Sequence, residues 1–190
     1  MSVSTTHPPF PVPKTIALVG LMGAGKSSVG RRLAQRLGLP FVDADSEIEA
    51  AAGCTIEEIF ERHGEAAFRD GERRVIARLL DGPQQVLATG GGAFMDAETR
   101  RLLRERAITL WLRADIELLL QRVSRRNNRP LLKTAEPRAV LERLMAERYP
   151  VYAEADIIVD SADGPPEATL ERAMAALAAF LGVAAAAGAQ

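Results

Sequence analysis

The sequence predicts a single three-layer α/β/α domain built around a five-stranded parallel sheet. The main observation is that short apolar runs ending at glycine or aspartate alternate with longer stretches of helical spacing. This alternation is typical of a parallel sheet whose two faces are covered by helices. In addition, a chain of 190 residues, 47% of them hydrophobic, suits one compact domain, and it contains neither an internal repeat nor an interdomain linker.

Each predicted element follows from its own local pattern. The five apolar runs predict strands over 15–20, 40–45, 85–92, 108–112 and 156–160. Helical spacing predicts helices over 26–37, 46–52, 55–80, 97–104, 116–123 and 136–149, and a terminal amphipathic helix that includes 170–181. Gly38 is a typical stop for the first helix, and Thr55 with Glu58 has the spacing of a capping box.

The two ends of the chain are expected to lie outside the domain. Residues 1–13 contain four prolines and no apolar run, which predicts a disordered leader. The uncharged stretch 173–190 is long enough to span a membrane, but alanine dominates it, and its helical spacing favours a helix packed on the domain. We therefore expect a single domain over 14–182 and a flexible tail over 183–190.

Composition bounds the partners of the protein. Lysine and arginine (24) nearly balance aspartate and glutamate (25), so the chain lacks the positive field that would hold nucleic acid or an anionic membrane. Its one cysteine, Cys54, cannot form an internal disulfide, which fits a reducing compartment. We expect a cytoplasmic monomer that binds neither nucleic acid nor a membrane.

The segment Gly20–Ser27 reads GLMGAGKS and matches the pattern G-x-x-x-x-G-K-[ST]. It follows an apolar strand and opens a helix, which is the context that a phosphate-binding loop requires. In such a loop, backbone N–H groups and the helix N-terminus bind phosphate oxygens, a lysine reaches the β- and γ-phosphates, and a hydroxyl ligates Mg²⁺. The predicted nucleotide-binding residues are Gly23, Ala24, Gly25, Lys26, Ser27 and Ser28.

A carboxylate for the metal is expected at the end of the second strand. The third strand ends in glycines, so Asp43 and Asp45 are the best source, and alternation along an extended chain would place both on one side. Asp43 and Ser27 are the predicted Mg²⁺ ligands, while Asp45 would face an acceptor hydroxyl. The alternative is that the two aspartates are only the N-cap and first-turn carboxylates of the next helix.

Six motifs together resemble the shikimate kinases, which are phosphate-loop kinases of the nucleoside monophosphate kinase-like group. They are the loop 20–27, the pair Asp43-x-Asp45, Phe68-Arg69-x-x-Glu72, the triplet Gly90-Gly91-Gly92, the string 129–132 and Arg148-Tyr149-Pro150-x-Tyr152. They occur in the family's order, and the similarity covers about 14–181. Because the combination is far more specific than any one motif, it carries the functional prediction.

The resemblance implies a substrate site for a hydroxylated organic acid. Arg69 and Arg148 would bind the substrate carboxylate, because two guanidinium groups select an acid over a neutral sugar. Gly90, Gly91 and Gly92 would let the main chain approach the substrate ring. Asp45 would accept hydrogen bonds from the ring hydroxyls, and it would orient the attacking hydroxyl and take its proton.

The resemblance also implies a lid over about 124–135. Arg129 in this basic segment would close over the ATP phosphates and counter charge in the transition state, as Lys26 does from the loop. Arg122 would lie on the adenine, while the loop near Pro165 and Pro166 stays unplaced. A nucleic-acid-binding patch made of Arg122 and the arginines of this basic segment is disfavoured, because no aromatic residue lies between them in the sequence.

The implied reaction transfers the γ-phosphoryl group of ATP, with Mg²⁺, to the 3-hydroxyl of shikimate, giving shikimate 3-phosphate. Two other enzymatic interpretations remain, a kinase for another hydroxy acid such as gluconate and a nucleoside monophosphate kinase. An interpretation of a different class is a catalytically silent nucleotide-binding module.

Overall fold

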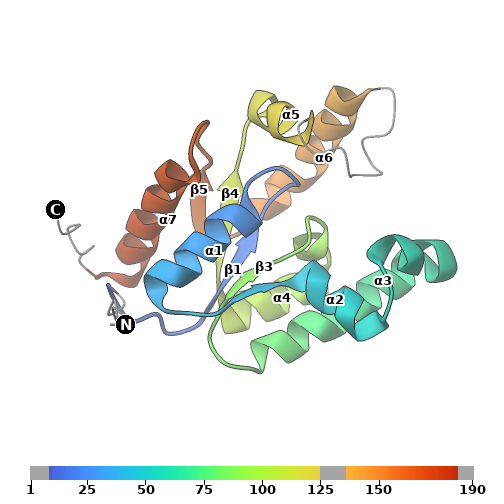
Figure 1. Ribbon diagram of the computed structural model, residues 1–190, viewed down its shortest axis with the longest axis horizontal. Helices are drawn as coiled ribbons and strands as arrows, with labels where there is room; N and C mark the ends of the chain where they lie inside the picture. The colour runs from blue at the N-terminus through green and yellow to red at the C-terminus, as the bar shows by residue number, and fades with distance from the viewer. Residues whose placement is uncertain (1–8, 125–135, 184–190) are drawn as a thin grey trace, which may run out of the picture.

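The computed structural model describes residues 9–124 and 136–183, which form three layers (Figure 1). The central sheet has five parallel strands in the order β2-β3-β1-β4-β5. Their bounds are β1 Thr15–Val19, β2 Phe41–Asp43, β3 Val86–Ala88, β4 Ala107–Arg113 and β5 Ile157–Asp160. The predicted α/β class and the five-stranded sheet are confirmed.

Helices cover both faces of the sheet, with α1 and α7 on one face and α3 and α4 on the other (Figure 1). The helices are α1 Lys26–Leu37, α2 Ala44–Ala52, α3 Ile56–Leu80, α4 Ala97–Arg106, α5 Ile116–Ser124, α6 Pro137–Tyr152 and α7 Pro166–Leu181, with a 3₁₀ helix η1 Ala93–Met95. Among the helices of residues 9–124 and 136–183, none combines the length and the hydropathy that a membrane-spanning segment requires.

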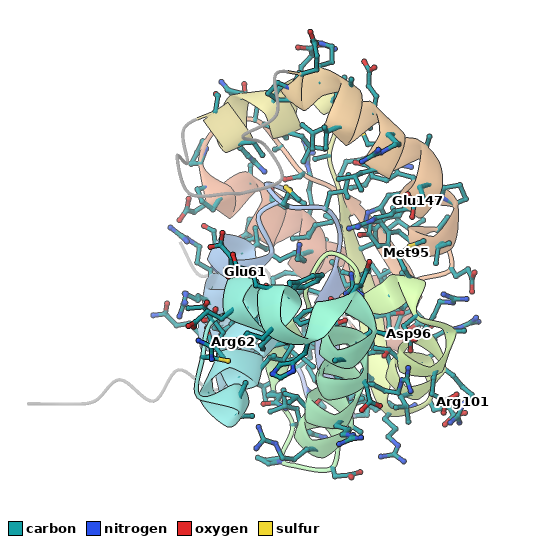
Figure 2. The ribbon with its side chains drawn as sticks, turned by 90° about the vertical axis from the view of Figure 1, so that its right-hand side faces the viewer. Glu61, Arg62, Met95, Asp96, Arg101 and Glu147 are labelled. Atoms are coloured by element: carbon teal, nitrogen blue, oxygen red, sulfur yellow. The ribbon has the colours of Figure 1, made fainter. Side chains whose placement is uncertain are left out.

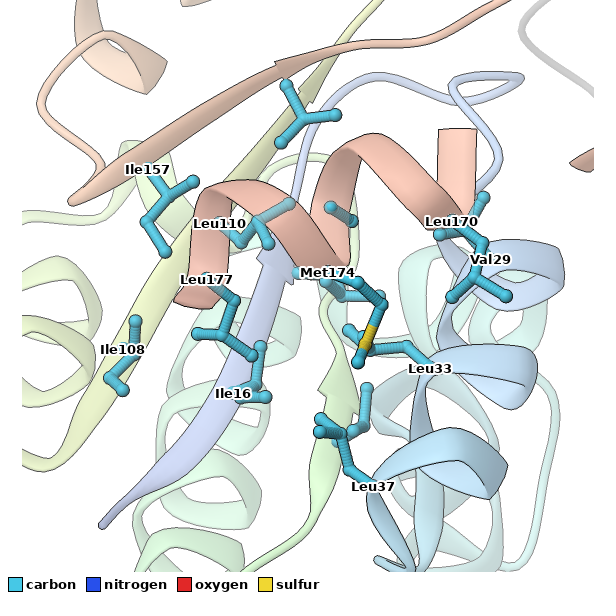
Figure 3. Close-up of a cluster of buried hydrophobic side chains, with 14 of the residues drawn as sticks. Ile16, Val29, Leu33, Leu37, Ile108, Leu110, Ile157, Leu170, Met174 and Leu177 are labelled. Atoms are coloured by element: carbon cyan, nitrogen blue, oxygen red, sulfur yellow. The ribbon is translucent and has the colours of Figure 1, made fainter. Parts of the chain in front are cut away.

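Alternation along the strands divides the core into two halves. In β1, Ile16 and Leu18 face the side of α1 and α7, where they meet Leu33 and Leu177 (Figure 3). On the other side, a second cluster joins the sheet to α3, α4, α5 and α6, and it includes the strand residue Trp111. Because successive side chains of β1 point to opposite faces of the sheet, they contribute in turn to two half-cores, which are the two clusters on its two faces.

Two predicted strands are too long, and both errors fall where the chain turns toward the site. Strand β2 stops at Asp43, because the Asp43 side chain accepts the Asp45 N–H and caps a helix that begins at Ala44. Strand β3 stops at Ala88, and the glycine triplet then turns into η1 instead of extending the sheet. The predicted helix over 55–80 is bent at Gly64, whose φ of 79° is outside the helical region.

The expectation of a leader outside the fold is wrong for residues 9–13. Phe10 is only 5% exposed and belongs to the half-core beneath α1 and α7, and Val12 packs against the same cluster. The Gln84 side chain also donates a hydrogen bond of 2.8 Å to the carbonyl of Pro13. One aromatic residue among prolines gives no periodic signal, which is why the sequence pattern missed it.

Phe10→Ala is expected to lower the free energy of unfolding by about 3 kcal/mol, the typical cost of emptying a buried aromatic site. Urea titration followed by circular dichroism measures it. Phe180→Ala is the matched control, because Phe180 on α7 is 50% exposed and its truncation should change stability by less than about 0.5 kcal/mol. Equal small changes in both variants would show that the Phe10 segment does not stabilise the domain.

Candidate active site

A cavity of about 780 Å³ opens at the carboxyl ends of the strands, where open α/β sheets bind their ligands. Its wall is built from the segments that follow β1, β2 and β3, together with parts of α3, α5 and α6. The charged, hydroxyl and glycine residues of its lining include Lys26, Ser27, Asp43, Asp45, Arg69, Glu72, Gly90, Gly91, Gly92, Arg122 and Arg148.

The first wall of the cavity is the glycine-rich loop between β1 and α1. Gly23 and Gly25 have φ values of 82° and 101°, a left-handed conformation that side chains disfavour, so glycine is needed at both. The Lys26 ammonium donates hydrogen bonds of 2.7 and 3.0 Å to the carbonyls of Gly20 and Leu21. The loop thus has the strand-to-helix geometry that the motif predicts, with the lysine folded across it.

Arg122 of α5 ties this loop to the segment that follows β5. Its guanidinium donates to the carbonyls of Gly23 and Ala24, each at 3.2 Å, and to Ser161 Oγ at 2.9 Å. The segment after β5, which the sequence left unplaced, reaches the cavity at this end through Pro166. Arg122 therefore lies beside the phosphate-binding loop, at the end of the cavity where the nucleotide is expected to bind. Its contact with adenine stays a prediction.

The second wall carries the two aspartates, and the expected extended geometry is wrong there. Asp43 caps α2, and Asp45 lies in its first turn, so the alternative of N-cap and first-turn carboxylates describes their backbone. Both side chains nevertheless line the cavity, and Asp43 Oδ2 accepts a hydrogen bond of 3.0 Å from Ser27 Oγ. A hydroxyl and a carboxylate oxygen side by side are the hard donors that Mg²⁺ prefers, so the pair fits the predicted metal.

The third wall is formed by Arg69 and Glu72 of α3, which share one helix face as their spacing predicts. Arg69 Nη1 donates a hydrogen bond of 2.7 Å to Glu72 Oε2, and the Glu72 side chain is only 1% exposed. Burial raises the pKa of the Glu72 carboxyl, while the hydrogen bond and charge of Arg69 oppose that rise. For Arg69, burial alone would lower the pKa, but Glu72 and Glu65 outweigh it and raise the pKa.

The glycine triplet brings these walls close together. A β-carbon on Gly90 would lie 2.8 Å from Asp45 Oδ1 and 2.9 Å from Glu72 Oε1. On Gly92, it would lie 2.6 Å from Arg69 Nη1. Any side chain at these positions would displace the charged groups, so the triplet is glycine because three charged side chains approach its main chain.

Arg148 of α6 approaches the same glycine segment at Gly91. Its Nη1 would be 3.3 Å from a β-carbon on Gly91, and that point is 3.7 Å from the carbonyl of Gly20 in the loop. Figure 2 shows this side of the molecule, with Glu147 of α6 and Met95 of η1 labelled, and α6 packs against η1 there. Arg69 and Arg148 therefore both reach a glycine segment that adjoins the phosphate-binding loop.

The family model that matches this chain and its relatives in sequence are shikimate kinases. A model of the shikimate kinase family matches residues 22–178. A shikimate kinase of Paramagnetospirillum magneticum is 63% identical over 168 residues, 88% of this chain and 86% of the relative. A shikimate kinase of Caulobacter vibrioides is 63% identical over 164 residues, 86% of this chain and 82% of the relative.

The chain belongs to the shikimate kinase family. Its structure also resembles that of a shikimate kinase from Acinetobacter baumannii in complex with shikimate. The TM-score is 0.81 and the identity 43%, with coverage of 89% of this chain and 93% of that one. The family resemblance seen in the six motifs is thereby confirmed, as is an ATP-dependent kinase fold.

The structure brings together most of the residues that were predicted for a shikimate kinase site. Of these, Gly23, Gly25, Lys26, Ser27, Ser28, Asp43, Asp45, Arg69, the glycine triplet, Arg122 and Arg148 line one cavity, whereas the buried Ala24 does not line it. Arg129 and the predicted lid over 125–135 lie outside the described residues, so their roles stay predictions.

One residue next to the site was not predicted for it. The buried Tyr152 donates a hydrogen bond from its hydroxyl to the carbonyl of Gly91. The sequence offered one signal, since Tyr152 follows Arg148 by four residues and therefore shares its helix face. Its partner is far away along the chain, which no local pattern reveals.

Proposed function

We propose that this chain transfers the γ-phosphoryl group of ATP to the 3-hydroxyl of shikimate, giving shikimate 3-phosphate. One observation carries the proposal. A single cavity holds a phosphate-binding loop on one wall and, facing the adjoining glycine segment, two arginines and Asp45. This arrangement provides for both substrates of a kinase that acts on a hydroxylated acid.

At the nucleotide end, the main chain of residues 23–28 and the N-terminus of α1 would bind the phosphates. The Lys26 ammonium, now bonded to loop carbonyls, would turn to the β- and γ-phosphates. Ser27 and Asp43 would hold Mg²⁺, directly or through water. When bound, the ion neutralises charge on the phosphates.

At the acid end, Arg69 and Arg148 would bind the shikimate carboxylate. Glu72 supports this role, because its ion pair fixes the Arg69 side chain at the cavity wall. Arg148 Nε is buried and has no hydrogen-bond partner within the part of the chain that the structure describes. A buried donor of this kind is costly until a ligand satisfies it, and a carboxylate would do so.

Between the two ends, the Asp45 carboxylate would accept a hydrogen bond from the hydroxyl that attacks the phosphorus. Its carboxylate lies against Gly90, beside Glu72, so both acceptors face the same point of the main chain. Among the described residues, Glu72 Oε1 also lacks a hydrogen-bond partner, which suits a second ring hydroxyl. Asp45 would thus orient the nucleophile and take its proton.

The remaining parts of the proposal come from the sequence. Arg129 would close over the phosphates as part of a lid over 124–135 and would exclude water from the reacting groups. Arg122 would lie against the adenine. The near-neutral charge supports the absence of nucleic-acid and membrane partners, and the lone Cys54 supports a cytoplasmic location. That the chain is a monomer is part of the same proposal.

The test is ADP production by the purified full chain with ATP and Mg²⁺ and, in parallel, shikimate, gluconate or AMP as acceptor. The proposal expects ADP release that depends on shikimate and the appearance of shikimate 3-phosphate. Turnover of gluconate or AMP without turnover of shikimate would overturn the substrate assignment. ATP binding with no turnover of any acceptor would favour the silent module instead.

A further inference from the structure

Tyr152, at the end of α6, connects two parts of the acid end of the cavity. It is fully buried within an aromatic cluster, with its ring 5.8 Å from that of Trp111 and 6.5 Å from that of Phe94. The packing fixes the ring, so the hydroxyl has one defined position, against the carbonyl of Gly91. Tyr152 itself does not line the cavity, and the proposed function gives it no role.

The Tyr152 hydroxyl also lies beside Arg148. Burial raises the pKa of this phenol, while the positive charge of Arg148 acts in the opposite direction. The phenol therefore stays protonated at neutral pH and donates to the carbonyl of Gly91. Arg148 Nη1 lies against the same glycine, so Tyr152 and Arg148 meet at one point of the cavity wall.

The bond to Gly91 also sets the orientation of a peptide at the cavity wall. The Gly91 carbonyl and the Gly92 N–H belong to one planar trans peptide, so they point in opposite directions. With the carbonyl held by Tyr152, the Gly92 N–H is directed away from the aromatic cluster. Glycines have little torsional preference of their own, so an outside anchor is needed to keep this peptide in one orientation.

We propose that the Tyr152 hydroxyl is a positioning group of the acid subsite, which holds the Arg148 guanidinium and the Gly91–Gly92 peptide in the geometry that binds the carboxylate-bearing substrate. The inference rests on the proposed function, since it names what prepares the same site. The Tyr152 hydroxyl acts through Arg148 and the main chain and does not contact the reacting atoms. Its removal should therefore weaken binding of the acid and leave binding of the nucleotide unchanged.

Tyr152→Phe keeps the ring and removes only the hydroxyl. We expect a KM for shikimate about 3- to 10-fold higher, the range of one buried hydrogen bond, with the KM for ATP unchanged. Tyr149→Phe is the matched control, because Tyr149 lies on the same helix, contacts the same cluster and donates its hydroxyl to the carbonyl of Ala114, away from the glycines. Its KM for shikimate should match that of the wild type.

A double-mutant cycle with Arg148→Ala separates positioning from general support. If Tyr152 acts through Arg148, Tyr152→Phe should raise the KM for shikimate much less in the Arg148→Ala background than in the wild type. The same fold-increase in both backgrounds, a parallel rise in the KM for ATP, or equal effects of Tyr149→Phe and Tyr152→Phe would overturn the proposal. Absence of shikimate turnover by the wild type would instead overturn the proposed function.

Discussion

Asp45→Asn should lower the kcat for shikimate-dependent ADP production by about 10²- to 10⁴-fold, the range that a positioned general base contributes. The amide keeps the size of the side chain but cannot take a proton, and it presents a donor where the carboxylate presents an acceptor. Asp45 Oδ1 lies against Gly90 at the cavity wall, so the change occurs where the acceptor hydroxyl is expected. Steady-state kinetics with saturating ATP and shikimate measure it.

Glu47→Gln is the control for this substitution. Glu47 is also on α2 but two residues further along, hence on a different face, where it pairs with Arg78 at 3.0 Å. The same change from acid to amide there should leave kcat unaltered. A kcat for Asp45→Asn within a few-fold of the wild type would remove Asp45 from the chemistry and leave it only the role of a first-turn carboxylate.

Arg148→Ala should lower kcat/KM for shikimate by at least about 30-fold, because losing one partner of a desolvated charge pair costs about 2–5 kcal/mol. The KM for ATP should change little, since Arg148 lies against Gly91 and not on the loop between β1 and α1. Arg143→Ala controls for loss of an arginine from α6, because Arg143 is exposed. If both variants keep the wild-type kcat/KM, Arg148 does not bind the substrate.

Arg148 is a cleaner target than Arg69. Removal of Arg69 would leave the buried Glu72 carboxylate without its ion pair, so activity and folding would change together. Gly92→Ala tests Arg69 more gently, because the three atoms nearest to the added methyl all belong to the end of the flexible Arg69 side chain. The displaced guanidinium should raise the KM for shikimate, while the fold is retained.

The parts of the site that local sequence defines were predicted well. The loop 20–27 needs its glycines, its lysine and a strand-to-helix context in one continuous segment, and the structure has all three. Arg69 and Glu72 share a helix face because they are three residues apart, and they form an ion pair there. Periodicity within a segment is sufficient in both cases.

Features that depend on distant partners could not be predicted in the same way. Asp45 was assigned to the cavity through strand alternation, but it reaches the cavity from the first turn of a helix that Asp43 caps. Tyr152 meets Gly91 only because α6 packs beside η1, and Phe10 is buried only because α1 and α7 leave room for it. Side-chain hydrogen bonds and packing across the fold decide these placements.

The central claim is that two guanidinium groups beside the phosphate-binding loop recognise a carboxylate, and the carboxyl group itself can be altered to test it. The measurement is kcat/KM of the full chain for shikimate and for shikimate carboxamide, which has the same ring hydroxyls but no charge. We predict a value at least about 30-fold lower for the amide, and a much smaller difference between the two compounds in Arg148→Ala. Equal kcat/KM values for acid and amide in the wild type would contradict the account.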